Sequence, residues 1–275
     1  MHRTRALAAL ALLAASALFA AGCGENTTEV EESVQSAEDN ALVENEFASI
    51  FEIVDNEATE NSVFGTGSAP NALAPPCLTR TVDTANRTLT LNFGSANCLC
   101  NDGRERRGTV TAVFEGKYKE AGSSVRITLG EDYAMNDMRV GGRTTATRNG
   151  PADFTLTVGG ASITTPTGTI LWSANRTVVR TEGDGTATPW DDVYRYTGSA
   201  YGTNRNGETF TVLIDEPLVK RMQSGCLANF VDGTLTLKGL SISTMTLDYD
   251  PVGGAACDRI AAVTINGSTR RIALR

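Results

Sequence analysis

The sequence predicts an all-β protein, a large antiparallel meander preceded by one amphipathic helix. From residue 77 onward, apolar residues alternate with polar ones in run after run, which is the pattern of strands with one buried face. Turn-forming residues separate these runs, and no helical periodicity of useful length follows residue 77. We expect about 13 to 15 strands with antiparallel neighbours. A sheet this wide must curl, close or split into two layers, so a curved half-barrel and a sandwich are both open.

The chain begins with the features of a lipoprotein signal peptide over residues 1–22. Two arginines precede an apolar run of 16 residues, which is too short to span a bilayer core comfortably. The segment Ala20-Ala21-Gly22-Cys23 then resembles the bacterial lipobox, and we expect Cys23 to carry the lipid. The alternative is an ordinary secretory signal that is cut near Ala21, with Cys23 incidental.

The expected anchor predicts where the protein resides. Two or more acyl chains on Cys23 suffice for stable attachment to a membrane. Gly24 stands where many inner-membrane lipoproteins have Asp, so we expect an outer-membrane anchor, with the domain on the periplasmic or cell-surface side. No other run in the sequence reaches transmembrane length.

The formal charge of −8 is unevenly distributed along the chain. Twelve acidic residues lie between Glu25 and Glu60, where no Lys or Arg occurs, whereas residues 77–275 carry 22 basic and 20 acidic residues. Residues 23–36 are therefore predicted to form an acidic tether. Residues 58–76, rich in Gly, Ser, Ala and Pro, are predicted to be a linker.

Residues 37–57, between tether and linker, show the spacing of an amphipathic helix. One apolar stripe contains Val43, Phe47, Ile50, Phe51 and Val54. Ser36 and Asp39 supply an S-x-x-D start signal. A helix so rich in glutamate and without lysine needs a surface for its stripe, which is either the body of the same protein or a partner protein.

The body at 77–275 is predicted from runs of alternating residues. The clearest runs are at 89–93, 125–129, 154–158, 210–214 and 235–237. In one of them Phe210, Val212 and Ile214 alternate with Thr211 and Leu213. Near the end of the chain Asn266-Gly267 separates two further runs, which is a strong signal for a two-residue hairpin.

Five cysteines remain after Cys23, and an envelope location permits disulfides. They are Cys77, Cys98, Cys100, Cys226 and Cys257. Proximity in the sequence favours a bond from Cys77 to Cys98 or Cys100, a second bond between Cys226 and Cys257, and one free thiol. The alternative is a thiolate metal site of Cys77, Cys98 and Cys100 with Asp102, although Asp102 is also placed to pair with the arginines that follow it.

Two groups of carboxylates lie in loops that contain Gly and Pro. They are Asp184, Asp191 and Asp192, and Asp248 with Asp250. Oxygen ligands in such loops can hold calcium, which is the only cofactor we consider. The alternative is turn chemistry, since Asp beside Gly or Pro is typical of turns. A pair of acids could also serve a glycan hydrolase, for which Asp191 and Asp192 are the candidates.

Five aromatic residues lie close in the sequence, Trp172, Trp190, Tyr194, Tyr196 and Tyr201, and the first four are the candidates for a ligand groove. On a concave face they could bind a hydrophobic ligand, and packing in the core or on the sheet is the alternative.

Several chemistries are excluded by composition. The only histidine is His2, inside the expected signal peptide, so a catalytic triad and a His-ligated metal are excluded from the mature chain. No concentrated basic face and no Gly-rich phosphate loop is evident, so we expect no nucleic-acid partner.

Several segments also resemble a known group of proteins. They are residues 101–108 (NDGRERRG), 190–199 (WDDVYRYTGS), 202–207 (GTNRNG) and the hairpin at 258–274. Together with the lipobox and the acidic segment, they resemble Bacteroidota-type cell-envelope lipoproteins of uncharacterised function. The resemblance covers most of residues 77–275 and implies no established activity, so it assigns no catalytic residue.

We therefore expect a membrane-anchored, non-enzymatic lipoprotein of the cell envelope. Its β domain would bind a hydrophobic ligand, a glycan or an envelope protein, with the helix at 37–57 as lid or docking element. The alternatives are a carboxylate-based hydrolase acting on glycans and a calcium-stabilised structural protein of the surface.

Overall fold

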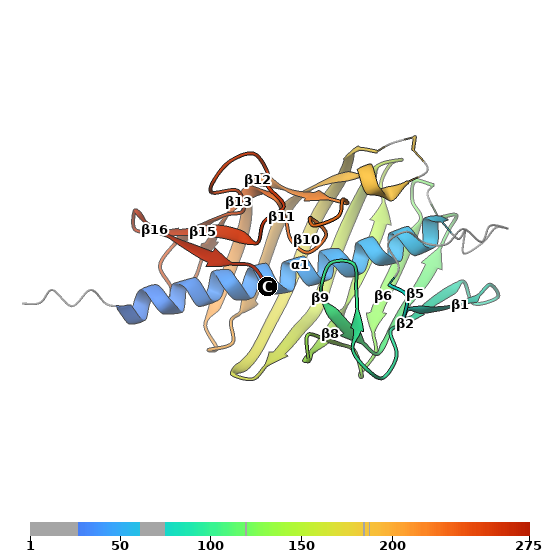
Figure 1. The fold of residues 1–275 in the computed structure, drawn as a ribbon, viewed down its shortest axis with the longest axis horizontal. Helices are drawn as coiled ribbons and strands as arrows, with labels where there is room; N and C mark the ends of the chain where they lie inside the picture. Colours follow the sequence, from blue (N-terminus) through green and yellow to red (C-terminus); the bar gives the residue numbers. More distant parts are fainter. Residues whose placement is uncertain (1–26, 61–74, 119, 184, 187) are drawn as a thin grey trace, which may run out of the picture.

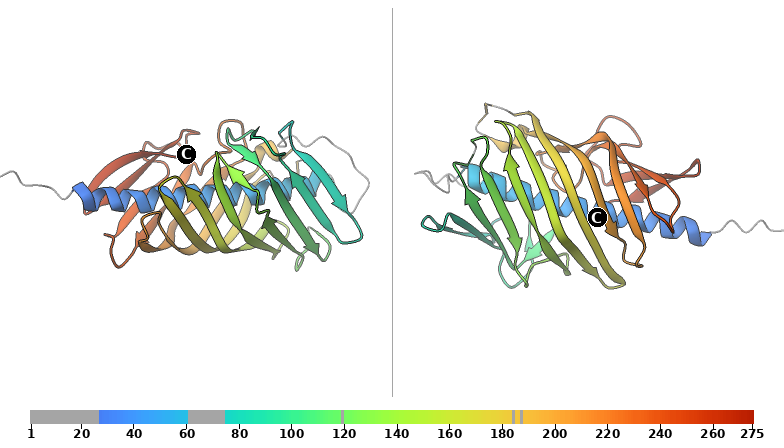
Figure 2. Two further views of the ribbon diagram at one scale, coloured as in Figure 1. Left: turned by 90° about the horizontal axis from the view of Figure 1, so that it is seen from below. Right: turned by 180° about the vertical axis from the view of Figure 1, so that it is seen from behind.

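The computed structural model describes residues 27–60, 75–118, 120–183, 185–186 and 188–275. It consists of one long helix, α1 (Thr27–Glu60), and one antiparallel sheet of 16 strands that curves around the helix (Figure 1 and Figure 2). The predicted all-β class is confirmed, and the strands form a single open sheet rather than a sandwich. The predicted signal peptide, Cys23 and most of the predicted linker lie outside the described residues.

The strands follow one another across the sheet almost in chain order. Their bounds are β1 Thr79–Asp83, β2 Thr88–Asn92, β3 Cys98–Leu99, β4 Glu105–Arg107, β5 Thr109–Glu115, β6 Ser124–Leu129, β7 Ala134–Met135, β8 Met138–Arg148, β9 Asp153–Thr165, β10 Gly168–Glu182, β11 Val193–Thr203, β12 Thr209–Arg221, β13 Asp232–Lys238, β14 Met245–Asp248, β15 Ile260–Ile265 and β16 Ser268–Ala273. Short turns join antiparallel neighbours, as expected for a meander. Three very short strands, β3, β4 and β7, pair beside the main path and are too short to leave a periodicity in the sequence.

Alternation along each strand decides which side chains face the concave surface. In β10, Ile170, Trp172 and Val178 point inward and are buried, whereas Leu171 and Asn175 between them point outward and are exposed. The same rule holds along the other long strands, so the core lies between the concave face and α1.

Helix α1 is longer than the predicted helix at 37–57. It begins at Thr27, so ten residues of the expected tether are helical, and it ends at Glu60. The sheet accounts for the earlier start: Val34 is buried, and Asn204 Nδ2 donates a hydrogen bond to Ser36 Oγ (2.8 Å). An acidic segment is expected to be disordered when no surface covers it, but tertiary contacts reverse that expectation here. No helix in the described part of the chain is both long and apolar enough to cross a membrane.

Both the apolar and the polar face of α1 are buried. On the apolar stripe, the Phe47 ring lies 6.2 Å from that of Trp172, and the Phe51 ring lies edge-on to that of Phe154 at 5.2 Å. The buried polar residues of α1 include Asp39, Asn40, Glu44, Glu46, Glu52 and Glu57. Buried carboxylates are stable only where groups of opposite charge face them, and the concave surface of the sheet supplies such groups.

Gly142 in β8 allows α1 to approach the sheet closely. Its φ of +132° is one that other residues rarely adopt, and a Cβ there would lie 2.8 Å from Ala161 Cα and 3.1 Å from Phe47 Cζ. The β8–β9 register also shifts between Gly141 and Arg143. Such an irregularity bends a sheet, so one position both curves the sheet and admits the Phe47 ring.

Candidate functional site

A buried ion-pair cluster joins the middle of α1 to β4. Arg106 Nε and Nη2 donate to the two carboxylate oxygens of Glu46 at 3.2 and 2.8 Å, and both side chains are fully buried. Arg106 also donates to both oxygens of Asp102 (2.9 and 2.8 Å), and the Tyr133 hydroxyl donates to Glu46 (2.8 Å). The sequence-based alternative that Asp102 pairs with the following arginines is confirmed, since it also contacts Arg104.

Burial and charge shift the pKa values in this cluster. Burial alone would raise the pKa of Asp102, but Arg106 and Arg104 outweigh burial and hold that pKa well below its usual value. Burial likewise would lower the pKa of Arg106, whereas Glu46 and Asp102 raise it. The charged side chains of this cluster therefore hold one another in place, and their role is structural.

Similar pairs extend along the whole helix. They join Asp39 to Arg205, Glu44 to Arg176 (2.6 Å), Glu52 to Lys220 (3.9 Å), Asp55 to Arg148 (3.6 Å) and Glu57 to Arg80 (3.3 Å). Burial raises the pKa of Glu52 and lowers that of Lys220. The acidic helix thus neutralises a basic concave face, and the concave space is filled by this chain itself.

The structure directs three of the four predicted groove aromatics toward this interior. Trp172 Nε1 donates to Asn40 Oδ1 (3.0 Å), and the Tyr196 hydroxyl donates to Glu52 (3.0 Å). The Tyr194 hydroxyl donates to Asp192 (3.0 Å). The fourth, Trp190, is partly buried against the core, in a short 3-10 helix. These rings do not form a ligand groove on the concave face, because α1 occupies the space that they surround.

The main apolar recess lies on the other, convex face of the sheet. This outer groove has a volume of about 690 Å³ and is lined by Leu171, Trp172, Tyr201, Phe210 and Leu240, among others. Three of the six exposed large apolar side chains of the described residues line it: Leu171 (52% exposed), Tyr201 (64%) and Leu240 (101%). A recess lined mostly by apolar groups, with a few polar groups at its rim, is the usual form of a small-molecule site.

The register of β10, β11 and β12 and the absence of a side chain at Gly202 shape the outer groove. Ser173 in β10 lies opposite Tyr201 in β11, which lies opposite Thr211 in β12, so outward side chains form a row across the sheet. At Gly202 a Cβ would lie 2.9 Å from Phe210 Cζ and 3.3 Å from Trp172 Cδ1. The absence of a side chain at Gly202 therefore makes room for the Trp172 and Phe210 rings on either side of it, and all three residues contribute to the lining of the groove.

Sequence reasoning missed most of the residues of the outer groove. Leu171 stands at an outward position of an alternating strand, where a polar residue is the usual choice. That break in the alternation was the available signal. Leu240 follows β13 in a loop, and no local pattern indicates that it lies beside β10 and β11.

The candidate carboxylates differ in exposure and in their hydrogen-bond partners. Asp191 is exposed and accepts a hydrogen bond from the Thr186 hydroxyl (2.9 Å), whereas Asp192 is buried and its pKa is raised by that burial. Asp248 accepts from the backbone N–H of Asp250 (2.9 Å), and Asp250 from that of Ala255 (2.8 Å). The hydrogen bonds that Asp248 and Asp250 accept from nearby backbone N–H groups are typical of turns, as the alternative interpretation predicts. Asp184 lies outside the described residues.

No metal centre is formed within the described part of the chain. Among those residues, no three His, Cys, Asp or Glu side chains are grouped so that they could hold a metal ion. The thiolate alternative is wrong because two of its sulfurs are joined to each other, in the Cys77–Cys98 disulfide.

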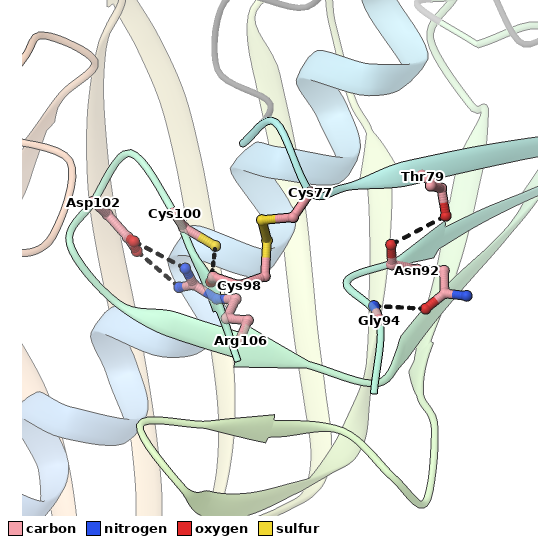
Figure 3. Close-up of a disulfide and its surroundings, with 8 residues drawn as sticks. All are labelled: Cys77, Thr79, Asn92, Gly94, Cys98, Cys100, Asp102 and Arg106. Carbon is pink, nitrogen blue, oxygen red and sulfur yellow. Dashed lines mark hydrogen bonds and ion pairs between the residues drawn. A yellow bond between two sulfur atoms is a disulfide. The ribbon is translucent and has the colours of Figure 1, made fainter. Parts of the chain in front are cut away.

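The disulfides follow the predicted neighbourhoods. Cys226 pairs with Cys257. Cys77 pairs with Cys98, and Cys100 beside them is a buried free thiol (Figure 3). The Cys100 thiol donates to the backbone oxygen of Cys98 (3.5 Å), and burial raises its pKa. Cys100 therefore has the character of a structural thiol, not of a nucleophile.

In comparisons with known proteins, no family model, no curated protein and no solved structure matches the chain.

Proposed function

We propose that this chain is a lipid-anchored protein of the cell envelope whose β domain is a non-enzymatic binding module for an apolar ligand. The anchor is the lipid on Cys23 in the outer membrane, and the ligand site is the outer groove. The signal-peptide pattern supports the anchor. Two disulfides support an oxidising compartment, since such bonds are rare where thiols are kept reduced.

The observation that carries this function is the contrast between the two faces of the sheet. On the concave face, charged and aromatic groups contact α1, whereas on the convex face three large exposed apolar side chains, Leu171, Tyr201 and Leu240, line an open recess. The volume of the outer groove, about 690 Å³, falls within the range of about 300 to 1,000 Å³ that is usual for small-molecule sites.

The lining of the outer groove also supports binding rather than catalysis. Its polar members are hydroxyls such as Ser173 and Thr211 together with Lys238, and the lining includes no carboxylate, thiol or imidazole. Hydrolysis of a glycan requires a pair of carboxylates across the bound bond. A groove with this lining therefore selects a ligand by apolar contact, with a few hydroxyls at its rim.

Native mass spectrometry of residues 24–275 tests this function. The protein is exported to a bacterial periplasm and purified without detergent, and we expect a bound mass that extracts as lipid. The double variant Tyr201→Ser/Leu240→Ser should lose that mass. A matched control, Leu99→Ser/Val252→Ser, removes two exposed apolar side chains that do not line the groove and should retain it. A ligand-free wild type would contradict the proposal, as would equal loss from both variants.

A further inference from the structure

The outer groove lies near the end of α1 that is closest to the expected anchor. Asn204 and Arg205, in the turn between β11 and β12, contact Ser36 and Asp39 of α1, and Trp172 of the groove contacts Asn40. These contacts place the groove beside the first half of the helix. The opposite end of α1 contacts β1 and the β5–β6 region instead, through Glu57 and Asp55.

The distance from the anchor to this region is limited by chain length. Only four peptide steps separate Cys23 from Thr27, where α1 begins, and they span at most about 14 Å. From Thr27 to Ser36 the helix rises about 14 Å. An acylated Cys23 therefore holds Ser36 of α1, which contacts the β11–β12 turn beside the groove, within about 30 Å of the bilayer surface.

The chemistry of the groove rim matches the boundary between a bilayer and water. Leu171 and Leu240 present alkyl groups, whereas Tyr201 and Lys238 combine an apolar body with a polar tip. Side chains of the second kind are favoured where one end meets hydrocarbon and the other meets water. The rim thus suits an acyl chain whose head group stays at the surface.

From this placement we propose that the occupant of the outer groove is an acyl chain of a phospholipid, taken from the same bilayer that holds the Cys23 anchor. This inference rests on the proposed function. The convex face over β10–β13 then faces the membrane, and the domain is held there by two contacts, the covalent lipid and the groove. The second contact orients the domain, which a single point of attachment does not do.

Fluorescence quenching tests the proposal, because Trp172 lies at the groove and bromine atoms quench an indole only at short range. The full chain, processed with its own leader and carrying Trp190→Phe, is reconstituted into phosphatidylcholine vesicles with or without brominated acyl chains. We expect Trp172 emission in the brominated vesicles to be at least halved. The added change Tyr201→Ser/Leu240→Ser should abolish quenching while the anchor stays in place, and Leu99→Ser/Val252→Ser should not.

Further measurements separate failure of this inference from failure of the proposed function. Bromostearic acid is added to the same anchored protein in unbrominated vesicles. Quenching by the free acid but not by brominated phospholipid would overturn the membrane occupant and leave the groove as a site for a soluble apolar ligand. Quenching by neither would overturn both. If Trp190→Phe does not fold, the wild-type chain is used, and the loss caused by Tyr201→Ser/Leu240→Ser isolates the groove contribution.

Discussion

Arg106 of β4 and Glu46 of α1 form a doubly hydrogen-bonded ion pair in which both side chains are fully buried. Removing one partner of such a pair leaves an uncompensated buried charge. We expect Glu46→Gln or Arg106→Met to lower the free energy of unfolding by about 3 to 5 kcal/mol in urea titrations. The exposed Arg107–Asp137 pair is the control, and Asp137→Asn should cost at most about 1 kcal/mol. Equal losses of unfolding free energy at the buried pair and at the exposed pair would show that burial of the Glu46–Arg106 pair adds nothing to its effect on stability.

The depressed pKa of Asp102 makes part of the stability dependent on pH. A carboxyl whose folded pKa lies below its unfolded pKa stabilises the fold above the unfolded value, and that contribution is lost as the pH falls. The difference in unfolding free energy between wild type and Asp102→Asn should therefore be full near pH 6 and shrink between about pH 4 and pH 2. The control is Glu115→Gln, which removes an exposed ion pair with Arg126. Its unfolding free energy should differ little from that of the wild type at every pH. If the difference in unfolding free energy between wild type and Asp102→Asn stayed constant down to the lowest pH, the Asp102 carboxyl would not contribute to the pH dependence of stability.

The state of Cys100 predicts a simple labelling result. Because the thiol is buried and its pKa is raised, iodoacetamide should modify it slowly in the native protein and rapidly after denaturation. Mass spectrometry of residues 24–275 without reduction should find one added label, on Cys100, and intact Cys77–Cys98 and Cys226–Cys257 bonds. Cys100→Ser should take up no label. Rapid native labelling, or a bond between Cys77 and Cys100, would count against this arrangement.

The tight contact at Gly142 predicts a large effect from one added methyl group. Gly142→Ala combines an unfavourable φ with contacts at Ala161 and Phe47, so it should destabilise the protein by more than about 1 kcal/mol. Gly122→Ala is the matched control, because Gly122 also has a positive φ but has open space around its Cβ. Thermal unfolding of the two variants measures the difference. Equal shifts in Tm would mean that the seating of α1 on β8 does not depend on this contact.

Local patterns were sufficient for the class of the fold. Period-two alternation identifies strands because one face of each is buried, as Leu89 and Leu91 show in β2. Turn chemistry identified the hairpin at Asn266, which has a positive φ. Proximity in the sequence predicted the Cys226–Cys257 bond and limited the partner of Cys77 to Cys98 or Cys100, of which the structure shows Cys98.

The position of α1 was harder to predict because long-range charge pairing determines it. The acidic segment and the basic body were visible in the sequence, and Arg176 stands in the inward register of β10, beside Ala174 and Val178. Such a charge is stable inside only with a partner, and no local rule shows that Glu44, far away in the sequence, is that partner. The outer groove was missed for a related reason, since Leu240 joins Leu171 only in the folded chain.

Amide hydrogen exchange with and without stearic acid tests most directly whether the ligand binds outside the curve of the sheet. The soluble domain, residues 24–275, is compared with its complex with the fatty acid. We predict that exchange slows in β10 to β12 beside Tyr201, while the amides of α1 stay equally protected in both states. Faster exchange along α1 on binding would contradict this prediction, because it would mean that the ligand displaces the helix and enters the concave face.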